Sequence, residues 1–433
     1  MSGVTLGAEL VVQGGRPLRG RLRLPGCKGI SHRGLLLAAL ADGRTRLENL
    51  ADGEDVGRTA GALDRLGVRI GRDSRVATIA AHGVGGLREP ETVIDCGNSG
   101  TTMRMLAGLV AGRPFLSVLT GDDSLSRRPM RRVVAPLRAM GATVDGRADG
   151  DLAPLTVRGG DLRGVRHELA VASGQVKTAL VLAGLQAGGE TEIVEPAPSR
   201  DHTERMLGAL GAPIERVDDR TLRVRAGAPQ PFELVVPGDP SSAAFFVVAA
   251  TIVPGSSIVL EDVSLNPGRV EYLDLLRAMG ARIEVDVLET RVGEPCGTIA
   301  VEAAPLHGIE ISGHEAIVDE LPVLAVAAAF ADGVTTIRDA AEMAVKETNR
   351  IGALEQELTQ LGIGVAARPD GLVIRGGAPK GATLKSHGDH RIALCGAVAG
   401  LAAEGETTVR GWPAVAISYP GFEADLAQLL DAP

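Results

Sequence analysis

The chain has 433 residues, of which 45% are hydrophobic and 23% are charged, and its formal net charge at pH 7 is −9. This composition excludes disordered and fibrous proteins and fits a globular protein of two or three domains. The acidic balance and an aromatic content of 2% argue against nucleic-acid binding, which uses basic surfaces and exposed aromatic faces.

The N-terminus and the hydropathy pattern favour a cytoplasmic protein. The first ten residues contain no basic stretch followed by an apolar one, so we expect no signal peptide. No uncharged apolar run reaches about 18 residues, so we expect no membrane span. The four cysteines, Cys27, Cys96, Cys296 and Cys395, lack the spacing of zinc ligands or of redox motifs. We therefore expect four reduced thiols and no metal site.

One structural unit recurs six times along the chain. Each copy contains an apolar helix, a turn with glycine, a short strand rich in β-branched residues, an amphipathic helix that ends at glycine, and another strand. The glycine that ends the apolar helix recurs at intervals of 67 to 78 residues, at Gly43, Gly112, Gly188, Gly255, Gly333 and Gly405. The repetition suggests two globular halves of three copies each, joined near residues 228–240.

The two helices of each copy differ in their pattern. The first is apolar on nearly every face, which predicts a buried helix, whereas the second has a polar stripe and is expected outside. Repetition alone does not assign the first strand, at residues 8–15, to either half.

Polar segments, most of them containing glycine, precede the six apolar helices, at residues 25–33, 95–104, 172–178, 238–243, 318–322 and 387–391. The first turn of a buried helix has unpaired N–H groups and a partial positive charge, which suit an anion. Glycine at such a position lets the backbone approach a ligand closely. These segments therefore predict binding of a multiply charged anion.

Basic side chains recur near the starts of the helices, namely Lys28, Arg33, Arg128, Lys177, Arg200, Lys346, Arg350 and Arg391. Arginine binds carboxylate and phosphate in a bidentate manner, and lysine can also carry protons. The set indicates a substrate with both phosphate and carboxylate groups. Asp319 and Glu347 stand among these cations, either as helix caps or as proton-transfer groups. His390 is either a core histidine or a site residue.

Eight motifs follow one another along the chain, namely PGCKGISHR, GNSGTTMR, GDDSLSRRPM, SGQVK, SRDHTERM, DELP, KETNR and GDHR. In this order they resemble the 3-phosphoshikimate 1-carboxyvinyltransferase (5-enolpyruvylshikimate-3-phosphate synthase) family. The resemblance implies an α/β fold, a two-domain inside-out α/β barrel in which each domain has three βαβαββ repeats around buried helices. It implies a first domain of residues 1–24 and 240–433, a second of residues 25–239, and an active site in the cleft between them. The N-terminal strand would then belong with the second half.

The resemblance also implies the reaction. The family transfers the enolpyruvyl group of phosphoenolpyruvate to the 5-hydroxyl of shikimate 3-phosphate, releasing phosphate by addition and elimination, on the shikimate pathway to chorismate and aromatic amino acids. Asp319 would be the base for the hydroxyl, and Glu347 with Lys28 would exchange a proton at the methylene carbon. No cofactor and no macromolecular partner is implied, and we expect a monomer.

The substrate-binding residues are likewise implied by the resemblance. Those for shikimate 3-phosphate are Lys28, Gly29, Arg33, Ser173, Gln175, Arg200, Asp319 and Lys346. Those for phosphoenolpyruvate are Lys28, Gly100, Arg128, Gln175, Arg350 and Arg391.

Three departures from the family pattern keep alternatives open. Gly29 stands where a substrate-binding Ser is normal, Asn349 stands where Asp is usual, and residues 416–422 lack a Lys that some members use on phosphoenolpyruvate. The alternatives are a paralogue with a different acceptor and a non-catalytic phospho-acid binder. A third is the sister family that acts on UDP-N-acetylglucosamine, whose reactive Cys is missing from the loop at residues 117–129.

Overall fold

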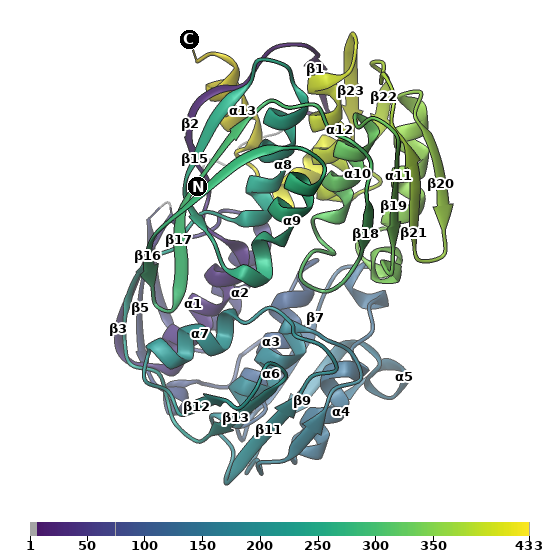
Figure 1. The fold of residues 1–433 in the computed structure, drawn as a ribbon. Helices are drawn as coiled ribbons and strands as arrows, with labels where there is room; N and C mark the ends of the chain where they lie inside the picture. The colour runs from purple at the N-terminus through teal and green to yellow at the C-terminus, as the bar shows by residue number, and fades with distance from the viewer. Residues whose placement is uncertain (1–6, 74, 433) are drawn as a thin grey trace. The chain divides into compact units, whose positions relative to one another are not determined.

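The computed structural model describes residues 7–73 and 75–432. Residues 1–6, on which the signal-peptide expectation partly rests, lie outside this part. The chain forms two compact units (Figure 1). Unit 1 comprises Met1–Pro25, Pro237–Glu289 and Pro295–Pro433, and unit 2 comprises Gly26–Val236 and Thr290–Glu294. The tip of one hairpin, Thr290–Glu294, thus belongs to unit 2, although the sequence analysis assigned residues 240–433 to the other half.

Unit 2 contains three copies of the same arrangement. Its buried helices are α1 (Lys28–Leu40), α3 (Gly100–Val110) and α6 (Gly174–Gly184), and its outer helices are α2 (Glu54–Arg65), α4 (Arg131–Ala139) and α7 (His202–Ala209). The first sheet contains β14 (Glu233–Val235), β3 (Asp42–Glu48), β5 (Val76–His82) and β4 (Arg69–Asp73) in that order. The second contains β6 (Ile94–Asp95), β7 (Leu116–Thr120), β9 (Leu152–Arg158) and β8 (Thr143–Gly146), with the short helix α5 (Arg147–Gly150) beside it. The third contains β10 (Arg166–Glu168), β11 (Glu190–Val194), β13 (Thr221–Arg225) and β12 (Ile214–Arg216).

Unit 1 repeats the arrangement, except that one of its sheets has three strands instead of four. Its buried helices are α8 (Pro240–Ile252), α10 (Leu321–Ala329) and α12 (His390–Ala402), and its outer helices are α9 (Pro267–Ala278), α11 (Arg350–Gln360) and α13 (Phe422–Leu430). One sheet contains β16 (Arg282–Arg291), β17 (Glu294–Glu302), β15 (Ser257–Ser264) and β2 (Arg19–Arg23). Another contains β18 (Glu310–Ser312), β19 (Val334–Arg338), β21 (Gly371–Arg375) and β20 (Gly364–Arg368). The three-stranded sheet contains β1 (Glu9–Gln13), β23 (Glu406–Arg410) and β22 (Thr383–Lys385).

The strand pairings explain how one repeat in each unit is completed from a distant part of the chain. In the first sheet of unit 2, β14 runs parallel to β3, with Glu233 opposite Arg46. In unit 1, β2 runs parallel to β15, with Arg19 opposite Ser257. The N-terminal strand β1 pairs antiparallel with β23 at the other end of the chain. The fold is therefore the α/β architecture of βαβαββ repeats that the family resemblance implied.

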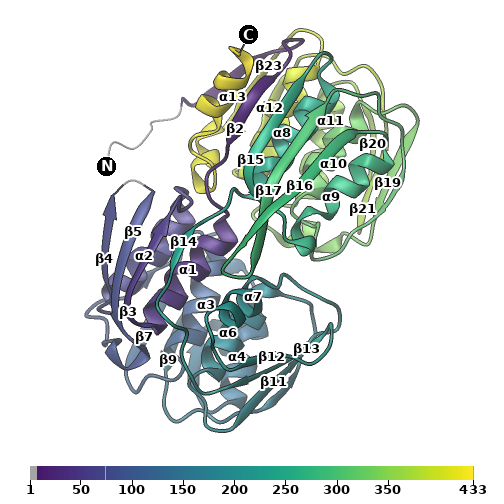
Figure 2. The same ribbon diagram turned by 60° about the vertical axis from the view of Figure 1, so that its left-hand side comes forward.

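Each unit has its own core around three apolar helices, as Figure 2 shows for α8, α10 and α12 in unit 1. In unit 2, α3 and α6 pack so closely that a Cβ at Gly108 would lie 2.1 Å from the carbonyl oxygen of Ala179. Only glycine fits there. Because these helices are buried on all sides, their first turns are the places where polar side chains gather. Within the described residues, no helix combines the length and the apolar character needed to span a membrane.

Candidate active site

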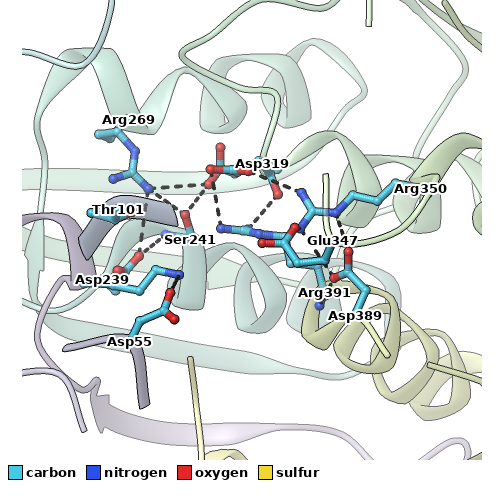
Figure 3. A network of polar contacts seen from close by, with 12 residues as sticks. Asp55, Thr101, Asp239, Ser241, Arg269, Asp319, Glu347, Arg350, Asp389 and Arg391 are labelled. Carbon is cyan, nitrogen blue, oxygen red and sulfur yellow. Dashed lines mark hydrogen bonds and ion pairs between the residues drawn. The ribbon is translucent and has the colours of Figure 1, made fainter. Parts of the chain in front are cut away.

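Arg350 is the centre of a cluster of carboxylates in unit 1 (Figure 3). It is the first residue of α11, and its side chain is 1% exposed. Its guanidinium donates from Nε to Asp389 Oδ2 at 2.8 Å and from Nη2 to Glu347 Oε2 at 2.7 Å, and its Nη1 lies 3.3 Å from Asp319 Oδ1. Burial alone would lower the pKa of Arg350, but the three carboxylates outweigh it and raise that pKa. Arg350 is therefore a permanent buried cation.

Asp319 lies directly before α10, between two arginines. Its main-chain carbonyl accepts a hydrogen bond from Arg391 Nη1 at 2.7 Å, and its Oδ2 lies 3.7 Å from Arg391 Nη2. Its side chain is 17% exposed, in contrast to that of Arg350. Arg391 is in the first turn of α12, and Asp389 caps that helix by accepting from the Arg391 N–H at 2.8 Å. Arg350 and Arg391 thus both hold Asp319, while its side chain stays partly exposed.

Glu347 and Lys346 lie between the 3₁₀-helix η3 (Ala341–Val345) and α11, and both are half-buried. Asn349, two residues after Glu347, differs from the family pattern, and its contacts in the structure explain its role. Asn349 is the N-cap of α11, and its side-chain oxygen accepts from the Gly352 N–H at 3.3 Å. Asn and Asp are equally good N-caps. The departure therefore leaves the start of α11 intact.

In unit 2, four residues predicted for the site lie at the starts of α3 and α6 or beside them. Gln175 accepts from Arg104 Nη1 at 2.6 Å and donates to Thr101 Oγ1 at 2.9 Å. Arg128 donates to Asn98 Oδ1 at 2.7 Å. Its Nη1 lies 3.5 Å from where a Cβ at Gly100 would be. Ser173 caps α6.

The start of α1 holds two more of the predicted residues, Lys28 and Gly29. Lys28 Nζ lies 3.2 Å from Asp55 Oδ2 on α2 and keeps part of its side chain exposed. Gly29 is next to it, and a Cβ there would meet only His202 and Arg33, at 3.4 Å or more. Arg200 lies beside Gly174 at the start of α6. Lys28, Arg33, Arg128 and Arg200 are the cations of unit 2 among the predicted site residues.

Arg33 is turned into the protein. It donates to Thr203 Oγ1 at 2.7 Å and Thr178 Oγ1 at 2.9 Å, and to the carbonyl oxygens of Gly29 and Gly174. These bonds tie α1 to α6 and α7. Burial lowers the pKa of Arg33 to about 10, so it remains charged at neutral pH. Its donors serve protein acceptors, and binding of shikimate 3-phosphate by Arg33 stays a prediction.

One predicted cation, Lys177, is turned into the protein, and three residues that bond to the site residues were not predicted. Lys177 is buried, with its Nζ 2.8 Å from both Glu195 and Glu204, so it is not offered to a ligand. The missed residues are Arg104, Asp55 and Asp389. Arg104 lies within the GNSGTTMR motif and Asp389 lies within GDHR, so both belong to segments already associated with the site. Their hydrogen-bond partners lie far along the chain and could not be predicted from the motifs.

The cysteines are poor candidates for chemistry. All four are buried thiols. Burial raises the pKa of Cys96 to about 12, and it raises the pKa of Cys395 as well. A thiol with such a pKa is almost never a thiolate nucleophile at neutral pH. In the described part of the chain, no group of three or more His, Cys, Asp or Glu could hold a metal ion.

Comparison with known proteins agrees with the resemblance. The family model described as EPSP synthase (3-phosphoshikimate 1-carboxyvinyltransferase) matches residues 12–426. A relative from Synechococcus sp., named 3-phosphoshikimate 1-carboxyvinyltransferase, is 50% identical over 98% of this chain and 97% of its own. One of the same name from Bacillus cytotoxicus is 46% identical over 95% and 98%.

Solved structures agree as well. The EPSP synthase from Acinetobacter baumannii superposes with a TM-score of 0.87 and 38% identity over 97% of each chain. The enolpyruvyl transferase NikO from Streptomyces tendae, at 22% identity over 97% of each chain and a TM-score of 0.80, shares the fold. From the length of the family match and the identity of these relatives, the chain belongs to the EPSP synthase (3-phosphoshikimate 1-carboxyvinyltransferase) family.

Proposed function

We propose that this chain transfers the enolpyruvyl group of phosphoenolpyruvate to the 5-hydroxyl of shikimate 3-phosphate and releases phosphate. The observation that carries the proposal is the pairing of Asp319 and Glu347 around one buried arginine, Arg350, in a member of this family. Carboxylates that accept and donate protons beside fixed cations suit a reaction between two anions. The reaction would lie on the shikimate pathway, and we propose a monomer acting in the cytoplasm.

The proposed chemistry assigns a proton to each step. Asp319 takes the proton of the 5-hydroxyl as that oxygen bonds to the central carbon of phosphoenolpyruvate. The methylene carbon gains a proton from Glu347 or Lys28, which gives a tetrahedral intermediate that still carries phosphate. In the second step the new methyl group returns a proton, the double bond forms again, and phosphate leaves.

The proposed binding roles follow the charges of the predicted site residues in the two units. Arginine forks suit the carboxylate and phosphate of phosphoenolpyruvate, and we assign Arg128, Arg350 and Arg391 to them. The first turn of α3, which begins at Gly100, adds backbone N–H groups. The remaining assignments for phosphoenolpyruvate are Lys28 and Gln175. For shikimate 3-phosphate they are Lys28, Gly29, Arg33, Ser173, Gln175, Arg200, Asp319 and Lys346.

One observation favours a second candidate, a related transferase with a different acceptor. Gly29 offers no hydroxyl where the family normally has Ser, so a contact to the acceptor is missing. A Cβ at this position would make only ordinary van der Waals contacts, so the neighbouring atoms do not force the residue to be glycine.

A substrate comparison tests both candidates. The purified chain is mixed with phosphoenolpyruvate and one of three acceptors, shikimate 3-phosphate, shikimate or UDP-N-acetylglucosamine. Phosphate release is followed with time, and the product mass is measured. The proposal requires release with shikimate 3-phosphate and a product heavier by one enolpyruvyl group. Release with another acceptor alone would support the second candidate, and release with none would favour a binder without turnover.

A further inference from the structure

Two adjacent carboxylates at the start of α10 point in different directions. Asp319 is partly exposed and lies beside Arg350 and Arg391. Glu320, the next residue, is 1% exposed and is directed to the start of α8 instead. Glu320 is the N-cap of α10 by position, yet its side chain does not cap that helix. Its partners therefore decide where the peptide that joins these two carboxylates lies.

Ser241 and Arg269, both labelled in Figure 3, bind Glu320 in a directed chain of hydrogen bonds. Arg269 Nη2 donates to Ser241 Oγ at 2.6 Å, and the Ser241 hydroxyl donates to Glu320 Oε1. The direction is fixed because arginine can only donate. Arg269 Nη2 also lies 3.7 Å from Glu320 Oε1 and 4.0 Å from Asp239 Oδ1.

Arg269 lies beside the buried carboxylate of Glu320. The titratable groups beside Glu320 are Arg269 and Tyr272 on α9, Asp239 before α8, and Asp319 on its own strand of chain. Burial raises the pKa of Tyr272, so this phenol is neutral, and its hydroxyl has no hydrogen-bond partner among the described residues. The guanidinium of Arg269 is 3% exposed and offsets the buried carboxylate. Without it, a buried carboxylate would face another carboxylate at a large cost.

We propose that Arg269 and Ser241 are positioning residues for Asp319. They bind the Glu320 side chain, while Arg391 Nη1 binds the Asp319 carbonyl at 2.7 Å, so both residues joined by the 319–320 peptide are held. The inference rests on the proposed function, because it assumes that Asp319 is the base. A base displaced by about 1 Å can cost 10²-fold in rate, so a two-sided anchor has a catalytic effect without touching substrate.

The main test compares Arg269→Met with Arg277→Met. Both arginines are on α9, but Arg277 is half-exposed and bonds to Asp274 and a main-chain oxygen of the same region, outside this network. We expect Arg269→Met to lower kcat by roughly tenfold or more, with KM for both substrates within about threefold, because positioning acts on the transition state. Arg277→Met should retain the parent kcat. Equal kcat in the two variants would overturn the inference.

Two further variants separate positioning from stability. Arg269→Lys keeps the charge and should recover part of kcat. The double change Arg269→Met with Glu320→Met removes both charges, so it should unfold at a higher urea concentration than Arg269→Met alone. Its kcat should stay low, since the anchor is still missing. Recovery of kcat in step with stability would show a merely structural role and overturn the inference.

Ser241→Ala provides the same test if the arginine variant does not fold. It removes one hydroxyl, leaves both charges, and should lower kcat severalfold with KM nearly unchanged. An unchanged kcat in this variant would contradict the inference. If the parent and Arg277→Met both fail to turn over shikimate 3-phosphate, the proposed function itself fails. Activity in those two with no loss in the network variants would reject only the inference.

Discussion

Asp389 accepts from Arg350 Nε at 2.8 Å and at the same time caps α12 through the Arg391 N–H at 2.8 Å. One fully buried carboxylate thus joins the starts of α11 and α12. The two arginines proposed to bind phosphoenolpyruvate in unit 1 are both placed by it. This relationship makes Asp389 a structural support for the cluster rather than a group that meets substrate.

Changing Asp389 to Asn should separate its two roles. Asn still caps the helix but removes the charge, so Arg350 keeps only Glu347 and Asp319 as charged partners. We expect the free energy of unfolding to fall by about 2 kcal/mol, in the range for hydrogen bonds to charged groups. Urea unfolding measures this, with the exposed Asp286→Asn as the matched control. Equal stability of the two variants would contradict the assignment.

Changing Asp319 to Asn tests the proposed base. The substitution keeps the shape of the side chain and removes its ability to accept the hydroxyl proton. We expect kcat to fall by about 10² to 10⁴ with little change in stability, since general base catalysis contributes that much. Steady-state phosphate release gives kcat, and circular dichroism checks the fold. A variant with near-full activity would exclude Asp319 as the base.

Local pattern predicted much of this fold. Helices such as α8 and α10 are apolar on every face, and the repeat of glycines fixed their spacing, so burial followed from the sequence. The pairings of β2 and β14 could not be predicted from the repeats alone. The unit 2 segment Gly26–Val236 separates β2 from β15 along the chain, and the other two repeats of unit 2 separate β3 from β14. Short strands carry no signal for a partner so far along the chain.

Only part of the site could be predicted, because the direction of each charged side chain depends on its hydrogen-bond and ion-pair partners. The carboxylates and cations of KETNR and GDHR were named as candidates because charged residues near buried helix starts are unusual. Whether such a cation faces a ligand depends on side chains far along the chain. Lys177 is turned inward by Glu195 and Glu204, and Arg33 is taken up by Thr178 and Thr203. Neither outcome is encoded in the residues next to them.

His32 should make stability depend on pH. Burial lowers its pKa well below 6.5, and Lys28 and Arg33 lower it further. Below pH 6.5 the unfolded chain therefore binds a proton that the folded chain does not, so the free energy of unfolding falls as pH falls. The slope from this group approaches about 1.4 kcal/mol per pH unit between its two pKa values.

The measurement is urea unfolding of the parent and of His32→Asn at pH 7.5 and pH 5.5. Asn has no titratable group, and its amide can replace the hydrogen bond between His32 Nδ1 and Thr59 Oγ1, which is 2.7 Å long. We expect the parent to lose more stability than the variant between the two pH values. Equal losses would mean that His32 does not carry this pH dependence.

Removal of the four cysteines should leave turnover within a few fold. All four thiols are buried, and the pKa of Cys96 is raised to about 12 by burial, so a thiolate is scarce. Alanine is preferable to serine here, because a buried hydroxyl without a partner would itself destabilise the fold. The Cys→Ala variant and the parent treated with iodoacetamide are assayed together. Loss of turnover in a folded variant would support a reaction that depends on cysteine.

The last prediction concerns Gly29, which lies in the first turn of α1. A Ser Cβ there would lie 3.4 Å from His202 Cδ2 and 3.6 Å from Arg33 Nη1, which are ordinary van der Waals contacts. Its hydroxyl would offer a hydrogen bond to an anionic group, a contact that contributes roughly 1.5 to 3 kcal/mol. Water and the closer backbone recover part of this in the parent, which leaves a gain near 1 kcal/mol, or about fivefold in affinity.

Gly29→Ser should therefore lower KM for shikimate 3-phosphate severalfold and leave kcat nearly unchanged, the pattern of a contact made equally in the ground and transition states. Gly57→Ser on α2 is the matched control, because a Cβ there would meet no atom within 4 Å. The control should keep the parent KM. If Gly29→Ser instead binds shikimate 3-phosphate more weakly than the control does, the space at Gly29 serves another acceptor. That result would favour the related transferase over the proposed reaction.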